Sequence, residues 1–145
     1  MKDIEYARID SLSLKLDLYL PAASQRKPLI VWVHGGAWRS GSKAEMPLGE
    51  LVKEGYPAAS VEYRLSPVAK FPAQIHDIKA AIRFLRAKAQ EFNIDATRMV
   101  IAGGSAGGHL AALVGVTNHD HELEGTIGGN LDQSSAVQGI ISYFG

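Results

Sequence analysis

The sequence contains no cysteine among its 145 residues, so disulfide bonds and thiolate metal sites are excluded. It also lacks any run of about 18 apolar residues, the length that a membrane-spanning helix needs. Fifteen basic and fifteen acidic side chains cancel, which argues against a nucleic-acid-binding surface or a patch for anionic membranes. The first ten residues hold no apolar signal segment. This slightly favours the cytoplasm, while a signal removed before this numbering leaves secretion open.

The pattern of apolar residues predicts one α/β domain over residues 1–145, with a mostly parallel sheet and helices on both faces. Residues 12–19 alternate apolar and polar, which predicts an antiparallel strand near an edge. Short unbroken apolar runs predict strands buried on both faces, and steps of three and four from Ile75 to Phe92 predict a helix. The predicted strands are 12–19, 29–33, 58–63, 99–102 and 137–144; the helices are 47–54, 72–92 and 106–116; the loops are 21–28, 93–98 and 119–135.

Ser105 lies in the sequence Gly-Gly-Ser-Ala-Gly, between a predicted buried strand and a predicted helix. This matches the G-x-S-x-G pattern of a nucleophile elbow, a sharp turn that exposes a serine hydroxyl. Gly103 and Gly107 are expected to be glycine because the chain passes so close at these positions that a Cβ atom would clash. The other reading, a glycine-rich phosphate loop, is disfavoured because Ser105 replaces the second glycine of G-x-G-x-x-G and no G-K-[ST] follows.

Residues 34–38, HGGAW, follow the predicted strand 29–33. Flexible glycines after a buried strand can aim backbone N–H groups at the oxyanion of a tetrahedral intermediate. Gly36, Ala37 and Ala106 are therefore the expected oxyanion-hole donors.

The other residues of this loop are expected to support it. His34 beside such a loop invites assignment as a general base, but a hydrogen bond to backbone that shapes the loop is favoured. Gly35 gives the loop its freedom, and Trp38 is expected to line a pocket or pack beneath the loop. Tyr63 and Arg64 are expected to pack and pair under the sheet.

These motifs together resemble the α/β-hydrolase esterases and lipases, in particular the hormone-sensitive-lipase-like and feruloyl-esterase-like (BD-FAE-like) groups. The stretches that carry the resemblance are HGGAW at 34–38, VEYRLSP at 61–67, FPAQIHDIKAAIRFL at 71–85, GGSAGGHLAAL at 103–113 and LEGTIGGNLDQSSAVQGIISYFG at 123–145. Alanine stands at position 37, where HGGG is more usual, and its N–H can still donate. The resemblance implies a triad in the order serine, acid, histidine.

Only 40 residues follow Ser105, and the resemblance places the triad acid and histidine beyond them, so the sequence resembles the amino-terminal half of a hydrolase. A triad built from local residues is disfavoured because base and nucleophile must come within hydrogen-bond reach. His109 is expected to be packed and hydrogen-bonded, and Asp77 is expected to serve the start of the long helix beside His76. The cluster 119–121 and Asp132 are expected in a solvated loop, with no metal site.

The expected function is hydrolysis of a small-molecule carboxylic ester, with a short-chain or aromatic acyl group by family analogy and with no cofactor or metal. A serine peptidase on the same fold is an alternative. A second alternative is a catalytically incomplete fragment or association domain. An α/β sheet ordinarily covers its strands with helices, so an exposed edge after Phe144 would pair with a second copy or a complementary chain.

Overall fold

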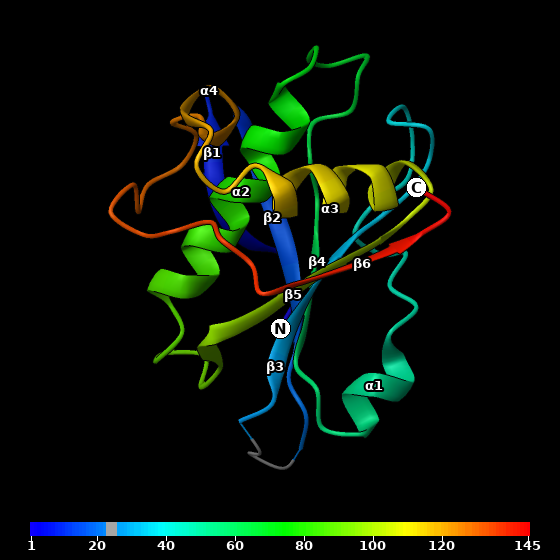
Figure 1. The fold of residues 1–145 in the computed structure, drawn as a ribbon, viewed down its shortest axis with the longest axis vertical. Helices are drawn as coiled ribbons and strands as arrows, with labels where there is room; N and C mark the ends of the chain where they lie inside the picture. Colours follow the sequence, from blue (N-terminus) through cyan, green and yellow to red (C-terminus); the bar gives the residue numbers. More distant parts are fainter. Residues whose placement is uncertain (23–25) are drawn as a thin grey trace.

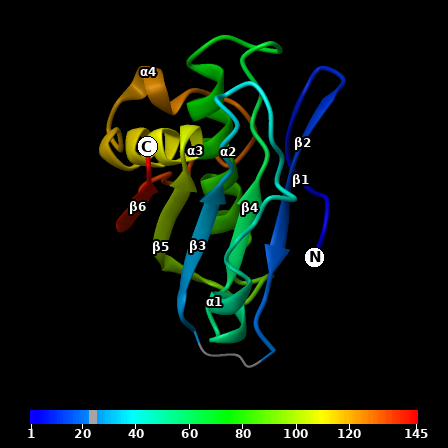
Figure 2. The ribbon, with the colours of Figure 1, turned by 90° about the vertical axis from the view of Figure 1, so that its right-hand side faces the viewer.

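A six-stranded sheet forms the centre of the molecule, with α1 on one face and α2 and α3 on the other (Figures 1 and 2). The structure is a computed structural model that describes residues 1–22 and 26–145, so part of the predicted loop 21–28 lies outside it. The strands are β1 (Ile4–Ile9), β2 (Leu12–Tyr19), β3 (Pro28–Val33), β4 (Ala58–Val61), β5 (Asp95–Gly104) and β6 (Gly139–Tyr143). The helices are α1 (Gly49–Lys53), α2 (Ala73–Ala87), α3 (Ala106–Val116) and α4 (His121–Glu124).

The strand order β1-β2-β4-β3-β5-β6 confirms the predicted α/β fold. β4, β3, β5 and β6 are parallel, whereas β2 pairs antiparallel with β1 and with β4. In the central register, Val31 of β3 lies opposite Ala59 of β4 and Ile101 of β5. Because the carboxyl ends of parallel strands meet at one edge, the loops after β3 and β5 come together there.

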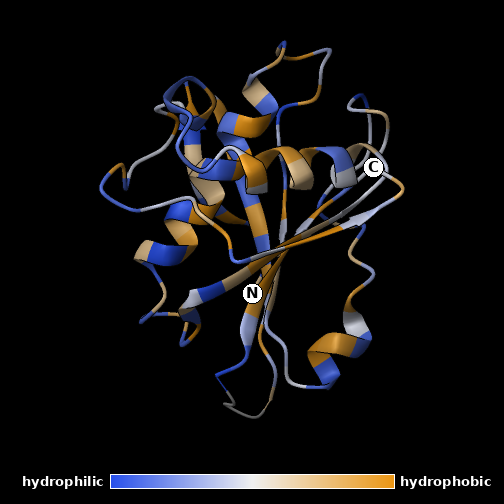
Figure 3. Cartoon of the chain, in the orientation of Figure 1, coloured by the Kyte–Doolittle hydropathy of each residue, from blue (hydrophilic) through white to orange (hydrophobic). Residues whose placement is uncertain are grey.

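β3 is buried on both faces, and its side chains alternate between two cores. The central strands of the sheet are coloured mainly as hydrophobic in Figure 3. Leu29, Val31 and Val33 belong to the large core under α2 and α3. Ile30 and Trp32 belong to a smaller core on the opposite face. This explains why β3 is an unbroken apolar run, and each fully buried aliphatic side chain contributes about 1.5–3 kcal/mol.

The antiparallel strand predicted over residues 12–19 near an edge is confirmed as β2, which lies second from the edge, beside β1. Three local features differ from the predictions. β1 was not predicted as a strand, because its apolar and polar residues do not alternate. Its register shifts between Glu5 and Ala7, so the consecutive residues Tyr6 and Ala7 are both buried. β5 begins at Asp95, within the predicted turn, because its pairing with β3 jumps from Asp95 to Met99. α4 is a single turn inside the predicted loop 119–135.

β6 is the other edge strand, and no described strand pairs with its outer edge. Its residues Ile140, Ile141 and Tyr143 are 41%, 39% and 47% exposed, and Phe144 after it is 97% exposed. The expectation of an incompletely covered last strand therefore agrees with the structure. Within the described chain, no helix is both long and apolar enough to cross a bilayer.

Candidate active site

Ser105 lies at the junction between β5 and α3, with an exposed side chain and a backbone conformation of φ 53° and ψ −122°. A left-handed φ at a residue with a Cβ atom costs on the order of 1–3 kcal/mol, and such strain concentrates at functional sites. The Ser105 N–H donates to the Tyr143 carbonyl at 2.7 Å, which fastens the turn to the end of β6. The hydroxyl therefore stands on a fixed, strained corner at the carboxyl edge of the sheet.

The glycines around Ser105 are dictated by close packing. A Cβ atom at Gly103 would lie 2.2 Å from the Gly107 carbonyl oxygen. One at Gly107 would lie 2.1 Å from the Val33 oxygen and 2.5 Å from the His34 oxygen. Since no side chain fits at either position, the start of α3 can approach β3 and β5 within backbone contact.

The loop after β3 lies beside Ser105. A Cβ atom at Gly35 would lie 3.5 Å from the Cβ atom of Ser105 and 2.8 Å from the Gly104 oxygen. Gly36, with φ 108°, accepts hydrogen bonds from the Arg39 and Ser40 N–H groups at 2.9 and 3.0 Å, and these close the loop. Because β3 and β5 are neighbouring strands, the HGGAW loop after β3 and the turn at Ser105 after β5 lie together.

The structure leaves donors available at this junction. Ala37 has φ 52° and an exposed side chain, and Ala106 is the first residue of α3, whose N–H has no partner within the helix. Across the described residues, the N–H groups of Gly36, Ala37 and Ala106 donate to no backbone carbonyl in a turn, loop or cap. The three predicted donors therefore come from the two segments that flank Ser105.

His34 is buried, with 2% of its surface exposed, and it shapes the loop. Its Nδ1 lies 2.7 Å from the Gly35 oxygen, so Nδ1–H donates to that carbonyl. Its ring stacks on Tyr63 with centroids 4.4 Å apart, and the Tyr63 hydroxyl donates to the His34 carbonyl at 2.9 Å. Burial lowers the pKa of His34 and raises that of Tyr63 to about 12. Both groups are neutral at pH 7, and neither bonds to Ser105.

Gly41 is a further part of this arrangement that the sequence analysis did not single out. Its φ is 91°, and a Cβ atom there would lie 2.5 Å from Nδ1 of His34 and 2.6 Å from the Gly35 oxygen. In the sequence, only the position of Gly41 in a glycine-rich loop could have indicated this role.

A pocket of about 540 Å³ opens beside the HGGAW loop. Trp38 is 40% exposed and forms one wall, as predicted, with its ring edge-on to His109 at 5.5 Å between centroids. The prediction that His109 is packed and hydrogen-bonded is wrong, because its position on α3 turns it outward to solvent over Trp38. The lining residues are Ala37, Trp38, Arg39, Ser66, Phe71, Gln74, His109 and Leu110.

Asp77 does not serve the start of α2, which corrects the prediction. It accepts hydrogen bonds from the backbone N–H of Arg64 at 2.9 Å and from the Arg64 guanidinium, whose Nη2 lies 2.8 Å away. The bond to Asp77 raises the pKa of Arg64 above its ordinary value. Asp77 is fully buried, and Arg64 is the partner that makes this burial tolerable. Tyr63 and Arg64 therefore pack and pair, as predicted.

His76 and the acids and histidines of residues 119–122 take part in contacts around α4 or are exposed there. His76 Nε2 lies 2.7 Å from the Glu122 carbonyl oxygen, and Asp120 caps α4 by accepting from the Leu123 N–H at 3.0 Å. His119 and His121 are exposed and follow the carboxyl-terminal end of α3, whereas Ser105 precedes its amino-terminal end. Among the residues placed by the structure, no three acids or histidines are grouped to hold a metal ion.

The sequence profile of the BD-FAE family matches residues 16–145. Esterase LipC of Mycobacterium tuberculosis is 38% identical over 78% of this chain and 29% of its own length. An arylesterase of Saccharolobus solfataricus is 32% identical over 81% of this chain and 39% of its own. This chain thus spans less than two fifths of these curated relatives.

Solved structures with a similar fold also include esterases. A bifunctional GH43-CE protein of Bacteroides eggerthii superposes with a TM-score of 0.90 and 36% identity, covering 99% of this chain and 20% of its own. A truncated carbohydrate esterase from gut microbiota superposes with a TM-score of 0.84 and 37% identity, and the match covers 94% of this chain and 53% of the esterase. Propionate-bound esterase Est2 of Thermogutta terrifontis superposes with a TM-score of 0.81 and 35% identity, and the match covers 94% of this chain and 51% of Est2.

Proposed function

Since the chain belongs to the BD-FAE family and has the fold of α/β-hydrolase esterases, we propose that it forms the amino-terminal portion of a carboxylic ester hydrolase with Ser105 as nucleophile. One observation carries this proposal: the exposed Ser105 side chain stands on a strained corner beside the HGGAW loop. The esterases named among its relatives support the reaction class.

In the proposed reaction, Oγ of Ser105 attacks the carbonyl carbon of the ester while its proton passes to a histidine base. The carbonyl oxygen becomes an oxyanion that accepts hydrogen bonds from the N–H groups of Gly36, Ala37 and Ala106. The tetrahedral intermediate collapses, the protonated base gives its proton to the departing alcohol, and an acyl-serine remains. Water then attacks this acyl group and releases the acid. Each oxyanion donor contributes a factor of about 10²–10³ in rate.

The base and acid of this proposal come from a segment beyond these residues, because the structure places none of the chain's own histidines in hydrogen-bonding contact with Ser105. The open outer edge of β6 supports this view. Tyr143 of β6 already holds the Ser105 N–H, so a segment that covers β6 would lie next to the nucleophile.

The pocket beside Trp38 and Phe71 supports a substrate with an apolar or aromatic acyl group. Phe71 is 58% exposed and Trp38 40% exposed, so both rings are available to a ligand. Ala37, one of the proposed oxyanion donors, lines the same pocket. A bound acyl group would therefore place its carbonyl close to this donor.

The test is acyl transfer from p-nitrophenyl acetate, followed by p-nitrophenol release and by the mass of the intact protein. We expect serine-dependent release from the protein that carries the segment supplying the base and acid, with peptide mapping that places the acetyl group on Ser105. Ser105→Ala should abolish it, and a complete triad should lose on the order of 10⁶ in rate. Ser11→Ala, an exposed serine in the turn between β1 and β2, is the matched control and should keep the activity. Equal release by Ser105→Ala and the parent protein would overturn the assignment.

A second candidate function, association through β6, is favoured by the exposed apolar residues of that strand. Unpaired, apolar strand edges are sites of chain association. Light scattering tests it: Ile141→Lys should abolish a dimer that the parent chain forms. A parent chain that is monomeric at every concentration would remove this candidate.

A further inference from the structure

The pocket beside the HGGAW loop carries a positive charge. Among the described residues that line it, Arg39 is the one permanent cation, and none is an aspartate or a glutamate. Glu45, a carboxylate of the same region, lines a different pocket together with His34 and Gly35. A ligand in the Arg39 pocket therefore meets one cation and no carboxylate.

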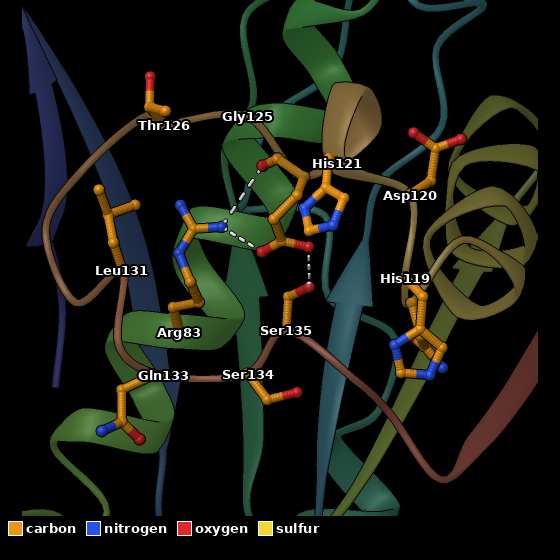
Figure 4. A pocket seen from close by; sticks show the side chains of 12 residues that line it. Arg83, His119, Asp120, His121, Gly125, Thr126, Leu131, Gln133, Ser134 and Ser135 are labelled. Carbon is orange, nitrogen blue, oxygen red and sulfur yellow. Dashed lines mark hydrogen bonds and ion pairs between the residues drawn. The ribbon is translucent and has the colours of Figure 1, made fainter.

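The guanidinium of Arg39 is available to a ligand. The residue is exposed, and within residues 1–22 and 26–145 no carboxylate or carbonyl accepts a hydrogen bond from its guanidinium. Arg83, labelled in the pocket of Figure 4, is different: it is 1% exposed, and its guanidinium is bonded to Glu124 and to the Ile127 carbonyl. Arg83 thus holds the fold together, whereas the charge of Arg39 has no such use inside the protein.

The backbone that carries Arg39 is fixed. The Arg39 N–H donates to the Gly36 carbonyl at 2.9 Å, and the Ser66 N–H donates to the Trp38 carbonyl at 2.7 Å. Ala37 and Trp38 both have left-handed φ values, 52° and 60°. Strain of this kind costs on the order of 1–3 kcal/mol for each residue and concentrates at functional sites. The base of the Arg39 side chain therefore keeps a constant position beside the pocket.

Arg39 also lies close to the proposed oxyanion site. Ala37, one of the proposed donors, precedes it by two residues, so their Cα atoms are at most about 7 Å apart. The rings of Trp38 and Phe71 are 40% and 58% exposed, and both residues line the same pocket. An aromatic acyl group that packs on these rings can place its ester carbonyl at Ala37 and a second substituent at Arg39.

The chemistry of the guanidinium indicates what this second substituent is. Arginine binds a carboxylate or a phosphate through two parallel N–H···O bonds. A phosphate group carries a charge of about −1.5 to −2 at pH 7, which a single permanent cation compensates only in part. A carboxylate carries one negative charge and matches the one cation of this pocket.

Resting on the proposed function, we propose that the substrate is a half-ester of an aromatic dicarboxylic acid, in which one acid group is esterified and the other is free. The free carboxylate binds Arg39 while the ester carbonyl accepts from the Ala37 N–H. Hydrolysis consumes one water and releases an aromatic dicarboxylate and an alcohol. Arg39 is then a residue that determines specificity for the acyl group.

The test compares monomethyl terephthalate with methyl 4-carbamoylbenzoate, which has a neutral amide in place of the carboxylate. Both probes are titrated into the ¹⁵N-labelled chain, and NMR follows the Trp38 indole N–H and the Arg39 Nε–H. We expect saturable shifts of both signals with the half-ester, and a Kd about 2- to 5-fold higher for the amide, as for an ion pair exposed to solvent. Arg39→Gln should make the two Kd values equal, and Arg39→Lys should keep part of the difference.

Three controls separate Arg39 from other sources of the preference. Arg8→Gln removes an exposed arginine of β1, outside the pocket, and should leave both Kd values unchanged. His109→Gln removes the other basic side chain of the lining and should keep the ratio of the two Kd values. Raising the salt concentration should reduce this ratio, because salt screens an exposed ion pair.

The proposal is overturned if the parent chain binds both probes equally or binds neither, or if His109→Gln rather than Arg39→Gln removes the preference. Ser105→Ala should bind both probes like the parent chain, because binding needs no nucleophile. A failed ester hydrolysis and a failed carboxylate preference therefore remain separate results.

Discussion

At the amino-terminal end of α3, Ser105 is held by backbone geometry, with glycines that allow β3, β5 and the helix to touch. At the carboxyl-terminal end, Lys79, Arg83 and Glu124 hold the structure through side-chain charges. The first end leaves N–H donors unused, whereas the second uses most of its donors internally. Backbone donors need no side-chain ordering, which suits an oxyanion site, while buried charges suit a fixed scaffold.

The largest effect on stability is expected at the charged end. Glu124→Gln leaves Lys79 and Arg83 buried without a carboxylate partner. Removing one partner of a buried ion pair costs about 3–5 kcal/mol, and we expect the free energy of unfolding to fall by this amount. Denaturant unfolding measures it. Glu91→Gln, in an exposed pair with Lys88, is the matched control and should cost less than about 1 kcal/mol. Equal losses of stability in Glu124→Gln and Glu91→Gln would mean that the ion pairs of Glu124 with Lys79 and Arg83 do not hold the fold together.

A smaller loss is expected at the glycine-built end. Gly107→Ala places a Cβ atom 2.1 Å from the Val33 oxygen, so α3 must move away from β3. Overpacking of this kind costs about 1–3 kcal/mol. Gly49→Ala, in α1, meets no atom within 4 Å and should instead stabilise slightly. Denaturant unfolding of both variants checks the difference, and a Gly107→Ala protein as stable as Gly49→Ala would contradict the close approach.

The smallest effects are pH dependences, and the two ends should show them in different windows. Burial lowers the pKa of His34 below 6.5, so the unfolded chain takes up a proton first as the pH falls below that value. Burial raises the pKa of Glu124, but hydrogen bonds from Ser135 and Arg83 and the charge of Lys79 outweigh it, and the pKa lies below 4.5. Both groups stabilise the fold at neutral pH, and both contributions decline in acid.

Thermal unfolding between pH 7 and pH 3 separates these contributions. His34→Gln should flatten the decline just below pH 6.5, and Glu124→Gln should flatten the decline below pH 4.5. Each is expected to change the slope by less than about 1.4 kcal/mol per pH unit. If His34→Gln left the decline in stability just below pH 6.5 unchanged, His34 would not be the group that titrates in this pH range.

Much of the fold follows from local patterns. The apolar runs located β3, β4 and the central part of β5, and the three- and four-residue steps located α2, because burial imposes these periods directly. β1 was missed because its register shift places two consecutive side chains in the core. Asp77 was misassigned because a carboxylate near a helix start is ordinarily a capping group, and nothing in the sequence shows that Arg64 reaches it.

The sequence alone determined that a serine follows a buried strand and precedes a helix, and that glycines surround it. Only the tertiary structure decided that the HGGAW loop lies beside this serine, that His109 faces solvent over Trp38, and that Arg83 of α2 pairs with Glu124 of α4. The reason is physical. A turn is fixed by the steric limits of its own few residues, whereas the distance between two loops depends on which strands become neighbours in the sheet.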